Sequence, residues 1–200
     1  MTRRIIVDDE PLSKNYLSKR LAHREEEYEQ LKLNVESHIN TLLLGPVGAG
    51  KTALANRVIR DLETRDIRYV DCTLYDTEFS VLREVLPTSR LIPLRSIYEL
   101  VKELAKAVKK KPVWICFDNF TRLKEVEVIR KVMSLGVNVI LIGNVERNAG
   151  VLNQNVLSNV PCLIKLPNYT LGQSFEILRD RAKESLAPSA FTDDLLKEIA

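Results

Sequence analysis

Residues 45–52 read Gly-Pro-Val-Gly-Ala-Gly-Lys-Thr and have the spacing G-x-x-x-x-G-K-[ST] of a phosphate-binding loop. The apolar run 41–44 precedes this loop, and residues 53–59 are typical of a helix. In that setting the glycines let backbone N–H groups and the helix N-terminus converge on one phosphate cluster. An ordinary glycine-rich turn would leave Lys51 and Thr52 unexplained. The predicted nucleotide contacts are Gly45, Pro46, Val47, Gly48, Ala49, Gly50, Lys51, Thr52 and Ala53.

An acidic residue at the end of a second apolar strand is expected to hold a metal ion. Residues 113–117 are almost wholly apolar and lead directly into Asp118. Such a strand is typical of a parallel sheet covered on both faces, and its carboxyl end is where α/β sheets place ligands. Asp118 is therefore expected to hold Mg²⁺ and a metal-bound water beside the Thr52 hydroxyl. The alternative is an ordinary aspartate at a strand end.

The hydrophobic pattern of the remaining chain predicts alternating helices and strands. Further strands are expected over 67–72, 137–143 and 162–166. The first helix follows His23, and its inner face is expected to consist of Tyr28, Leu31, Val35 and Ile39. Other helices are expected after Thr77 and Ser96, over 126–133, and after Thr170 and Thr192. Five strands separated by helices predict a doubly wound parallel sheet.

Composition is that of a compact domain and excludes few functions. With 200 residues, of which 45% are hydrophobic, the chain can bury a sizeable core. No apolar run approaches the ~20 residues of a membrane span, and the start lacks a signal-peptide pattern. A cytoplasmic protein without a membrane partner is therefore expected. Cys72, Cys116 and Cys162 are predicted to be reduced core residues, and a net charge of +3 permits but does not require a nucleic-acid partner.

Several stretches outside the phosphate-binding loop form a recognisable pattern. They are Leu-Ala-His-Arg-Glu-Glu-Glu at 21–27, Tyr-Val-Asp-Cys at 69–72, Asp118, Asn-Tyr-Thr at 168–170 and Ile-Leu-Arg-Asp-Arg-Ala at 177–182. Over most of the chain, this pattern resembles the AAA+ portion of archaeal replication initiators related to the origin recognition complex and the cell-division-control loader. The resemblance implies an α/β P-loop AAA+ domain whose five-stranded parallel sheet is sandwiched by helices, followed by the start of an α-helical lid.

The resemblance also implies domain limits and further site residues. Residues 1–167 would form the nucleotide-binding base, with 1–20 as an arm over the domain, and 168–200 a lid that is cut short. His23 and Arg24 would be nucleotide contacts, and Tyr169 and Arg181 would line the pocket from the lid side. Tyr169 could equally be a hinge core residue, Arg181 a surface cation and His23 a surface or capping residue. Asn144, after the strand 137–143, could be the sensor of the γ-phosphate or an ordinary loop cap.

Departures from this family are equally informative. Asn119 stands where the family usually has a catalytic glutamate, and an amide cannot take a proton at neutral pH. Asn155 stands where the arginine finger is expected, a residue worth several powers of ten in rate. The segment that resembles the DNA-contacting insertion has Arg90 and Arg95 but lacks the usual glycine. These changes predict a diverged paralogue with weak ATPase activity.

The sequence therefore predicts an ATP-binding or ADP-binding, Mg²⁺-dependent domain of a replication initiator, in which nucleotide controls conformation and assembly. Expected partners are nucleotide, duplex origin DNA in the full-length protein, and other AAA+ subunits in a homo-oligomer or hetero-oligomer. One alternative is a nucleotide-stabilised interaction module that does not hydrolyse ATP. Another is an AAA+ ATPase of transposition or helicase loading. A winged helix downstream of Ala200 would favour the initiator.

Overall fold

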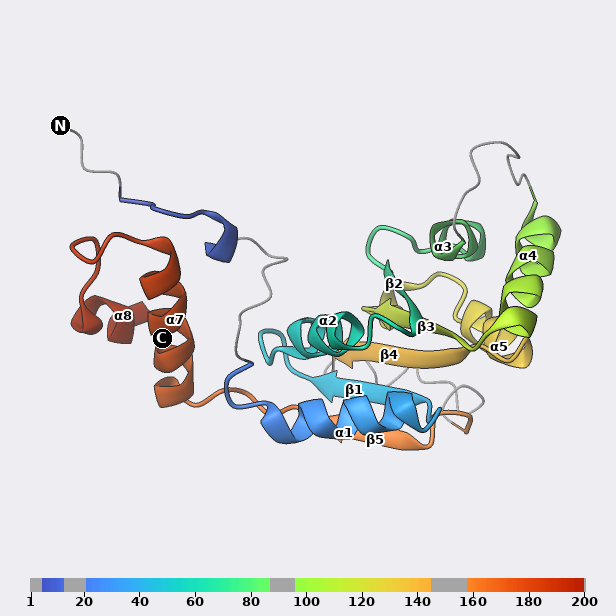
Figure 1. Cartoon of the computed structure of the whole chain (residues 1–200), viewed down its shortest axis with the longest axis horizontal. Coiled ribbons are helices and arrows are strands. Elements are labelled where there is room, and N and C mark those ends of the chain that lie inside the picture. The colour runs from blue at the N-terminus through green and yellow to red at the C-terminus, as the bar shows by residue number, and fades with distance from the viewer. Residues whose placement is uncertain (1–4, 13–20, 87–95, 145–157, 200) are drawn as a thin grey trace.

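The computed structural model describes residues 5–12, 21–86, 96–144 and 158–199, which form a sheet with helices on both faces and a helical pair beside it (Figure 1). In chain order the elements are η1 (Glu10–Leu12), α1 (Glu25–Glu36), β1 (Thr41–Gly45), α2 (Lys51–Asp61), β2 (Asp66–Asp71), α3 (Glu78–Val85), α4 (Ile97–Lys110), β3 (Val113–Asp118), η2 (Phe120–Arg122), α5 (Glu127–Ser134), β4 (Asn138–Asn144), β5 (Cys162–Lys165), α7 (Leu171–Ser185) and α8 (Asp193–Ile199).

All described strand pairs are parallel, and the strand order is β2-β3-β4-β1-β5. The register pairs Gly45 at the end of β1 with Asn144 at the end of β4. It also pairs Asp71 at the end of β2 with Asp118 at the end of β3. The loops that follow these strands therefore meet at one edge of the sheet, where parallel α/β sheets bind ligands. The predicted five-stranded parallel sheet is confirmed.

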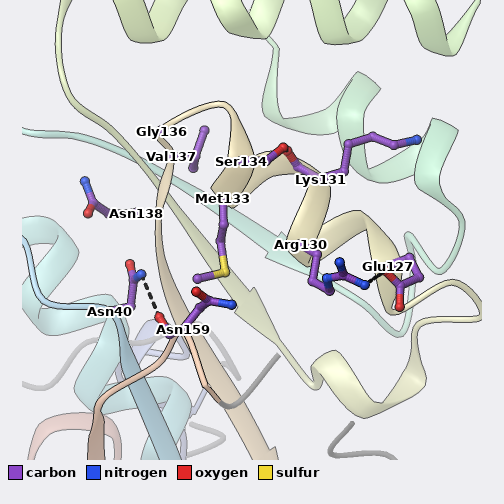
Figure 2. Close-up of a pocket in the computed structure, with 10 residues that line it drawn as sticks. All are labelled: Asn40, Glu127, Arg130, Lys131, Met133, Ser134, Gly136, Val137, Asn138 and Asn159. Atoms are coloured by element: carbon purple, nitrogen blue, oxygen red, sulfur yellow. Dashed lines mark hydrogen bonds and ion pairs between the residues drawn. The ribbon is translucent and has the colours of Figure 1, made fainter. Parts of the chain in front are cut away.

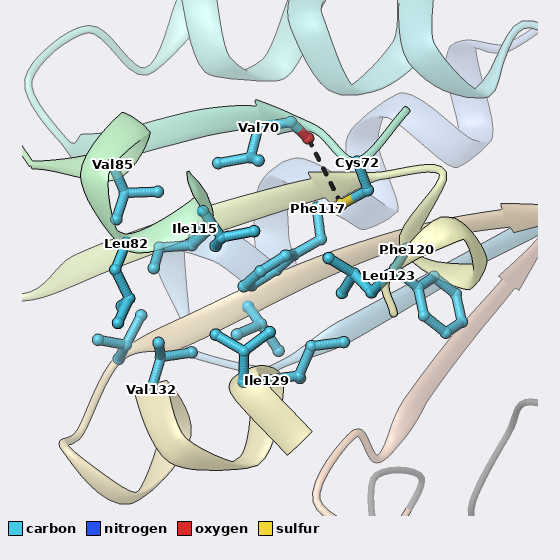
Figure 3. Close-up of a cluster of buried hydrophobic side chains, with 14 of the residues drawn as sticks. Val70, Cys72, Leu82, Val85, Ile115, Phe117, Phe120, Leu123, Ile129 and Val132 are labelled. Atoms are coloured by element: carbon cyan, nitrogen blue, oxygen red, sulfur yellow. Dashed lines mark hydrogen bonds between the residues drawn. The ribbon is translucent and has the colours of Figure 1, made fainter. Parts of the chain in front are cut away.

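Two hydrophobic clusters cover the two faces of the sheet. The cluster under α1 and α2 includes Leu31, Leu54, Trp114 and Ile140. The cluster under α3, α4 and α5 is larger, and Figure 3 shows helix side chains converging on those of the strands. Its labelled members are Val70, Cys72, Leu82, Val85, Ile115, Phe117, Phe120, Leu123, Ile129 and Val132. All six residues of β3 are buried, as the apolar run 113–117 predicts for a strand with helices on both sides.

Side-chain caps fix the starts of three helices where the sequence predicts them. Thr77, Ser96 and Thr170 each accept a hydrogen bond from the backbone N–H three residues later, and each forms a reciprocal capping box. Near the start of α8, the Leu195 N–H donates to the Thr192 hydroxyl at 3.3 Å. Within the described ranges, we find no helix with both the length and the apolar character needed to cross a membrane.

The first helix ends earlier than its hydrophobic pattern suggests. Ile39 lies beyond α1 and is 37% exposed, so the prediction that it belongs to the inner helical face is wrong. His38 adopts the left-handed conformation with φ 59°, and the Ile39 N–H donates to the Asn34 carbonyl at 2.8 Å. This is the hydrogen-bonding pattern of a helix C-terminal stop. The turn is usually marked by glycine, which is absent here, so the sequence gives no warning of it.

The described part of the N-terminal arm lies against the helical pair and not over the sheet (Figure 1). Ile6 forms an antiparallel bridge with Leu186, which follows α7. The Val7 N–H donates to the Ser185 carbonyl at 2.8 Å, and the Ala187 N–H donates to the Ile5 carbonyl at 2.9 Å. The start of the chain is therefore attached to the element that follows the sheet.

Candidate functional site

The predicted phosphate-binding loop connects β1 to α2 at the carboxyl edge of the sheet. Gly48 and Gly50 have φ values of 84° and 87°, a region that residues with a Cβ seldom adopt. Gly50 is also the N-cap of α2. A Cβ on Gly50 would lie 2.5 Å from the Tyr169 hydroxyl, so this glycine serves both the turn and a close approach of the tyrosine. The N-terminus of α2 thus lies within the loop, as anion binding requires.

The ammonium group of Lys51 is held inside this loop. Its Nζ donates to the carbonyl oxygens of Gly45 at 2.8 Å and Pro46 at 2.6 Å, and to Asn144 Oδ1 at 3.1 Å. Burial lowers the pKa of Lys51 below its usual value, while the nearby Asp118 carboxylate opposes that shift. The lysine is therefore a positive charge with neutral acceptors around it, at the place where phosphates would bind. Asn144, the candidate sensor, lies in the same site.

Asp118 lies at the end of β3 with only 3% of its surface exposed. Its Oδ2 accepts hydrogen bonds from the Thr52 hydroxyl at 2.8 Å and the Tyr69 hydroxyl at 2.7 Å. Its Oδ1 is buried without a hydrogen-bond partner among the described residues. Because Mg²⁺ prefers oxygen ligands and a buried carboxylate oxygen is rarely left without a partner, the Thr52 and Asp118 oxygens fit a magnesium site.

Asn119 follows Asp118 in the left-handed conformation, with φ 55° and ψ 41°, and precedes η2. Asparagine is one of the few residues with a side chain that occupy this region readily. A glutamate at this position would carry a larger backbone strain. The backbone conformation at position 119 therefore suits the asparagine that is present.

Arg24 is 3% exposed and connects the phosphate-binding loop with the chain that leads to α7. Its guanidinium donates to the Ala49 carbonyl at 3.1 Å and to the Pro167 carbonyl at 2.6 Å. It also lies 4.1 Å from the centre of the Tyr169 ring, within the range of a cation–π interaction, and 3.5 Å from Glu27. Arg24 and Tyr169 are therefore both part of the wall of the candidate site.

Of the other predicted residues, His23 contacts the helical pair, Arg181 lies on it, and three fall outside the described residues. His23 Nε2 lies 2.8 Å from Glu176 Oε2 on α7, so this imidazole contacts the helical pair. Arg181 lies on α7, roughly 15 Å along the helix from its start, and its side chain has no hydrogen-bond or ion-pair partner in the described part of the chain. Arg90, Arg95 and Asn155 fall outside the described residues.

A separate cavity of about 660 Å³ lies at the opposite end of the strands, where β1 and β4 begin (Figure 2). Its lining includes Asn40, which precedes β1, and Asn138, which begins β4. Asn40 donates to the Asn159 carbonyl at 3.0 Å, and Arg130 donates to Glu127 at 2.9 Å. Two polar pairs of this cavity thus bind each other, while Lys131 binds Glu78 outside it, and the cavity is distinct from the phosphate-binding loop.

The sequence pattern indicates no role for Tyr69, although its hydroxyl donates a hydrogen bond to Asp118. Burial, the hydrogen bond to Asp118 and that residue's charge raise the pKa of Tyr69 well above its usual value, so the phenol remains a donor. Because side chains alternate along a strand, the sequence shows only that residues 69 and 71 point to the same face of β2. The contact with Asp118 could be predicted only after β2 and β3 were known to be neighbours.

The fold and the loop define an α/β P-loop domain of the AAA+ class. No family model matches the chain. Among curated proteins, ORC1-type DNA replication protein 2 of Methanothermobacter thermautotrophicus is 25% identical to this chain. The alignment covers 98% of this chain and 61% of that protein. This chain spans about six-tenths of the length of the curated relatives it matches.

Two solved structures share the fold. Cdc6p of Pyrobaculum aerophilum has a TM-score of 0.80 and 23% identity, with 98% of this chain and 59% of that chain covered. ORC1 of Aeropyrum pernix, solved in complex with DNA, has a TM-score of 0.81 and 23% identity, with coverage of 96% and 57%. With the curated relative, these matches confirm the resemblance to archaeal initiators of the ORC1 and Cdc6 type.

Replacing Arg24 with Met should lower the free energy of unfolding by about 2–3 kcal/mol, because the Ala49 and Pro167 carbonyls would lose a charged donor. The control is Arg130→Met, which breaks an exposed pair with Glu127 and should cost less than about 1 kcal/mol. Urea denaturation of the two variants measures both effects. Equal losses would contradict a structural role for the Arg24 contacts.

Proposed function

We propose that this chain is the nucleotide-binding AAA+ portion of a DNA replication initiator, in which ATP or ADP acts as a conformational switch and hydrolysis is weak. The observation that carries this proposal is the meeting of Lys51, Thr52 and Asp118 at the end of β1 and β3. A lysine, a hydroxyl and a carboxylate in this arrangement have the chemistry that phosphate and Mg²⁺ need. The resemblance to ORC1-type proteins supports the initiator role.

Nucleotide binding would use groups that are already in place. The N-terminal N–H groups of α2 and the Lys51 ammonium would bind the phosphates, and Lys51 would exchange the Gly45 and Pro46 carbonyls for phosphate oxygens. The Thr52 hydroxyl donates a hydrogen bond to Asp118, and its oxygen would keep a lone pair with which to hold a metal ion. When bound, Mg²⁺ would neutralise phosphate charge between these groups.

The switch would act through the connection between the loop and the helical pair. We assign residues 1–167 to the base and 168–200 to the beginning of the lid. Arg24 contacts both Ala49 in the phosphate-binding loop and Pro167 just before the lid. Tyr169 lies against Gly50 at the start of α2. A nucleotide that moves the loop or the tyrosine would therefore also alter the position of α7.

Hydrolysis would be slow because Asn119 offers no general base beside Asp118. Asn155, in place of an arginine finger, would deprive a neighbouring subunit of a cation. Nucleotide occupancy would then persist, which suits a switch better than a motor. A module that binds ATP without any hydrolysis is the second candidate, and the position and conformation of Asn119 are the observations that favour it.

Duplex DNA and further AAA+ subunits are the proposed partners. The ORC1 protein of Aeropyrum pernix was solved with DNA, and its fold is similar to that of this chain. We assign DNA contacts in this chain to Arg90 and Arg95, in the segment between α3 and α4. Two arginines provide few phosphate contacts, so the affinity of these 200 residues for DNA would be low.

The Lys51→Ala variant should bind ATP and ADP at least about tenfold more weakly than the natural chain, because a charge-assisted contact to phosphate is lost. Isothermal titration calorimetry measures the affinities, and circular dichroism checks the fold. Lys106→Ala on α4, away from the site, is the control and should bind normally. Unchanged affinity of the folded Lys51→Ala variant would refute the assignment of the phosphate-binding loop.

Single-turnover ATP hydrolysis by the natural chain should be slower than ~1 s⁻¹. Asn119→Glu should raise the rate only modestly, because a glutamate at φ 55° is strained and the arginine finger is still missing. Adding Asn155→Arg should help only at protein concentrations where subunits associate. Asn119→Gly, which relaxes the backbone without adding a base, is the control. A natural rate of ~1 s⁻¹ or faster would mean that another residue activates water.

Binding of duplex DNA should be weak and should fall steeply as salt is raised, because the expected contacts are electrostatic. The double variant Arg90→Ala/Arg95→Ala should bind still more weakly. Arg60→Ala, an exposed cation on α2, should have no comparable effect. Fluorescence anisotropy at two salt concentrations measures this, and sequence-specific binding near ~10⁻⁸ M would contradict it.

A further inference from the structure

Tyr69 reaches Asp118 from the neighbouring strand. The register pairs Tyr69 with Cys116, so Asp118 lies two residues further along β3. Two residues of a strand span about 6.6 Å, a distance that a tyrosine side chain can bridge and a serine or threonine cannot. The Tyr69 hydroxyl lies 2.7 Å from Asp118 Oδ2. Both the ring and the hydroxyl are needed for this contact.

The two carboxylate oxygens of Asp118 differ in their hydrogen bonding. Oδ2 accepts two hydrogen bonds, one from Thr52 and one from Tyr69. Oδ1 is buried and has no hydrogen-bond partner among the residues that the structure describes. Two donors on one oxygen fix the rotation of the carboxylate about its last side-chain bond. The unpaired Oδ1 is then the oxygen available to a cation or its bound water.

Thr52 and Tyr69 are not equivalent as donors. The Thr52 hydroxyl belongs to the phosphate-binding loop and would itself become a ligand of the metal. Tyr69 comes from β2 and packs against the cluster under α1 and α2, so its ring is carried by the sheet and is not itself part of the phosphate-binding loop. Tyr69 can therefore hold Asp118 in one orientation whether or not nucleotide is bound.

We propose that Tyr69 is a positioning residue for the metal, which orients Asp118 so that Oδ1 faces Mg²⁺ in the nucleotide complex. This inference rests on the proposed function, because it requires that the loop bind a nucleotide with Mg²⁺. Tyr69 does not contact the nucleotide in this proposal. Loss of the Tyr69 hydroxyl should therefore reduce the gain in nucleotide affinity that Mg²⁺ gives, and should leave the affinity without Mg²⁺ unchanged.

A second tyrosine in the same chain provides a matched control. The Tyr28 hydroxyl donates to Asp61 Oδ2, also at 2.7 Å, between α1 and α2. Tyr28→Phe and Tyr69→Phe therefore each remove one phenol that is bound to an aspartate, and each keeps the ring. Only Tyr69→Phe affects the aspartate beside the phosphate-binding loop.

The experiment measures ATP affinity by calorimetry, in EDTA and in excess Mg²⁺, for the natural chain, Tyr69→Phe, Tyr28→Phe and Asp118→Asn. In EDTA, Tyr69→Phe should bind within about twofold of the natural chain. The gain in affinity on adding Mg²⁺ should fall by about threefold to tenfold, as expected when one hydrogen bond of ordinary net strength no longer orients Asp118. Tyr28→Phe should keep the full gain, and Asp118→Asn should lose most of it.

The outcomes separate this inference from the proposed function. If the natural chain binds no ATP with or without Mg²⁺, the proposed function fails. If it binds ATP and Tyr69→Phe shows the natural gain with Mg²⁺, the role of Tyr69 is refuted. Equal weakening in EDTA and in Mg²⁺ would also refute it, since that is the effect of a general structural residue. Binding by the natural chain without any gain from Mg²⁺ would refute it too.

Discussion

The buried guanidinium of Arg24 is the interaction on which the arrangement of the site depends. A charged group that is 3% exposed must have hydrogen-bond partners, because burying it alone would be very costly. Its partners include the Ala49, Pro167 and His23 carbonyls and the Glu27 carboxylate, and its face lies against the Tyr169 ring. The Ala49 and Pro167 carbonyls come from the phosphate-binding loop and from the chain before α7. Because the buried Arg24 guanidinium needs hydrogen-bond acceptors, it joins the phosphate-binding loop to the segment that leads into α7.

The parts of this structure that the sequence predicts are those with a local cause. The loop 45–52 has a fixed spacing, the apolar run before Asp118 specifies a buried strand, and capping residues such as Thr170 mark helix starts. The partners of Arg24 and Tyr69 have no such local cause, since each depends on which strands and loops are neighbours. The end of α1 before Ile39 has no glycine to mark it, because the left-handed residue of this helix stop is His38.

Asn119 shows how a departure from a family pattern can be reflected in backbone geometry. Its φ of 55° is accessible to asparagine and unfavourable for glutamate. Asp118 nevertheless keeps its burial and its two hydroxyl donors. The groups suited to bind a metal are thus present, while the neighbouring residue has an amide and not a carboxylate. In the proposed function, metal binding and hydrolysis therefore depend on adjacent residues, so one could change without the other.

The attachment of the N-terminal arm to the helical pair has a consequence for hydrogen exchange and folding. Among the described residues, Ile5, Val7 and Asp8 are joined to residues 185–187 by backbone hydrogen bonds, and Ile5 and Val7 remain 64% exposed, so their detachment would expose little further apolar surface. Its opening is therefore a local event of low free energy that leaves the sheet intact. The bridge between Ile6 and Leu186 also closes a loop of almost the whole chain, so its formation carries a loop-closure entropy cost that contacts between near residues do not. The amide hydrogens of this arm are therefore expected to exchange before those of the sheet.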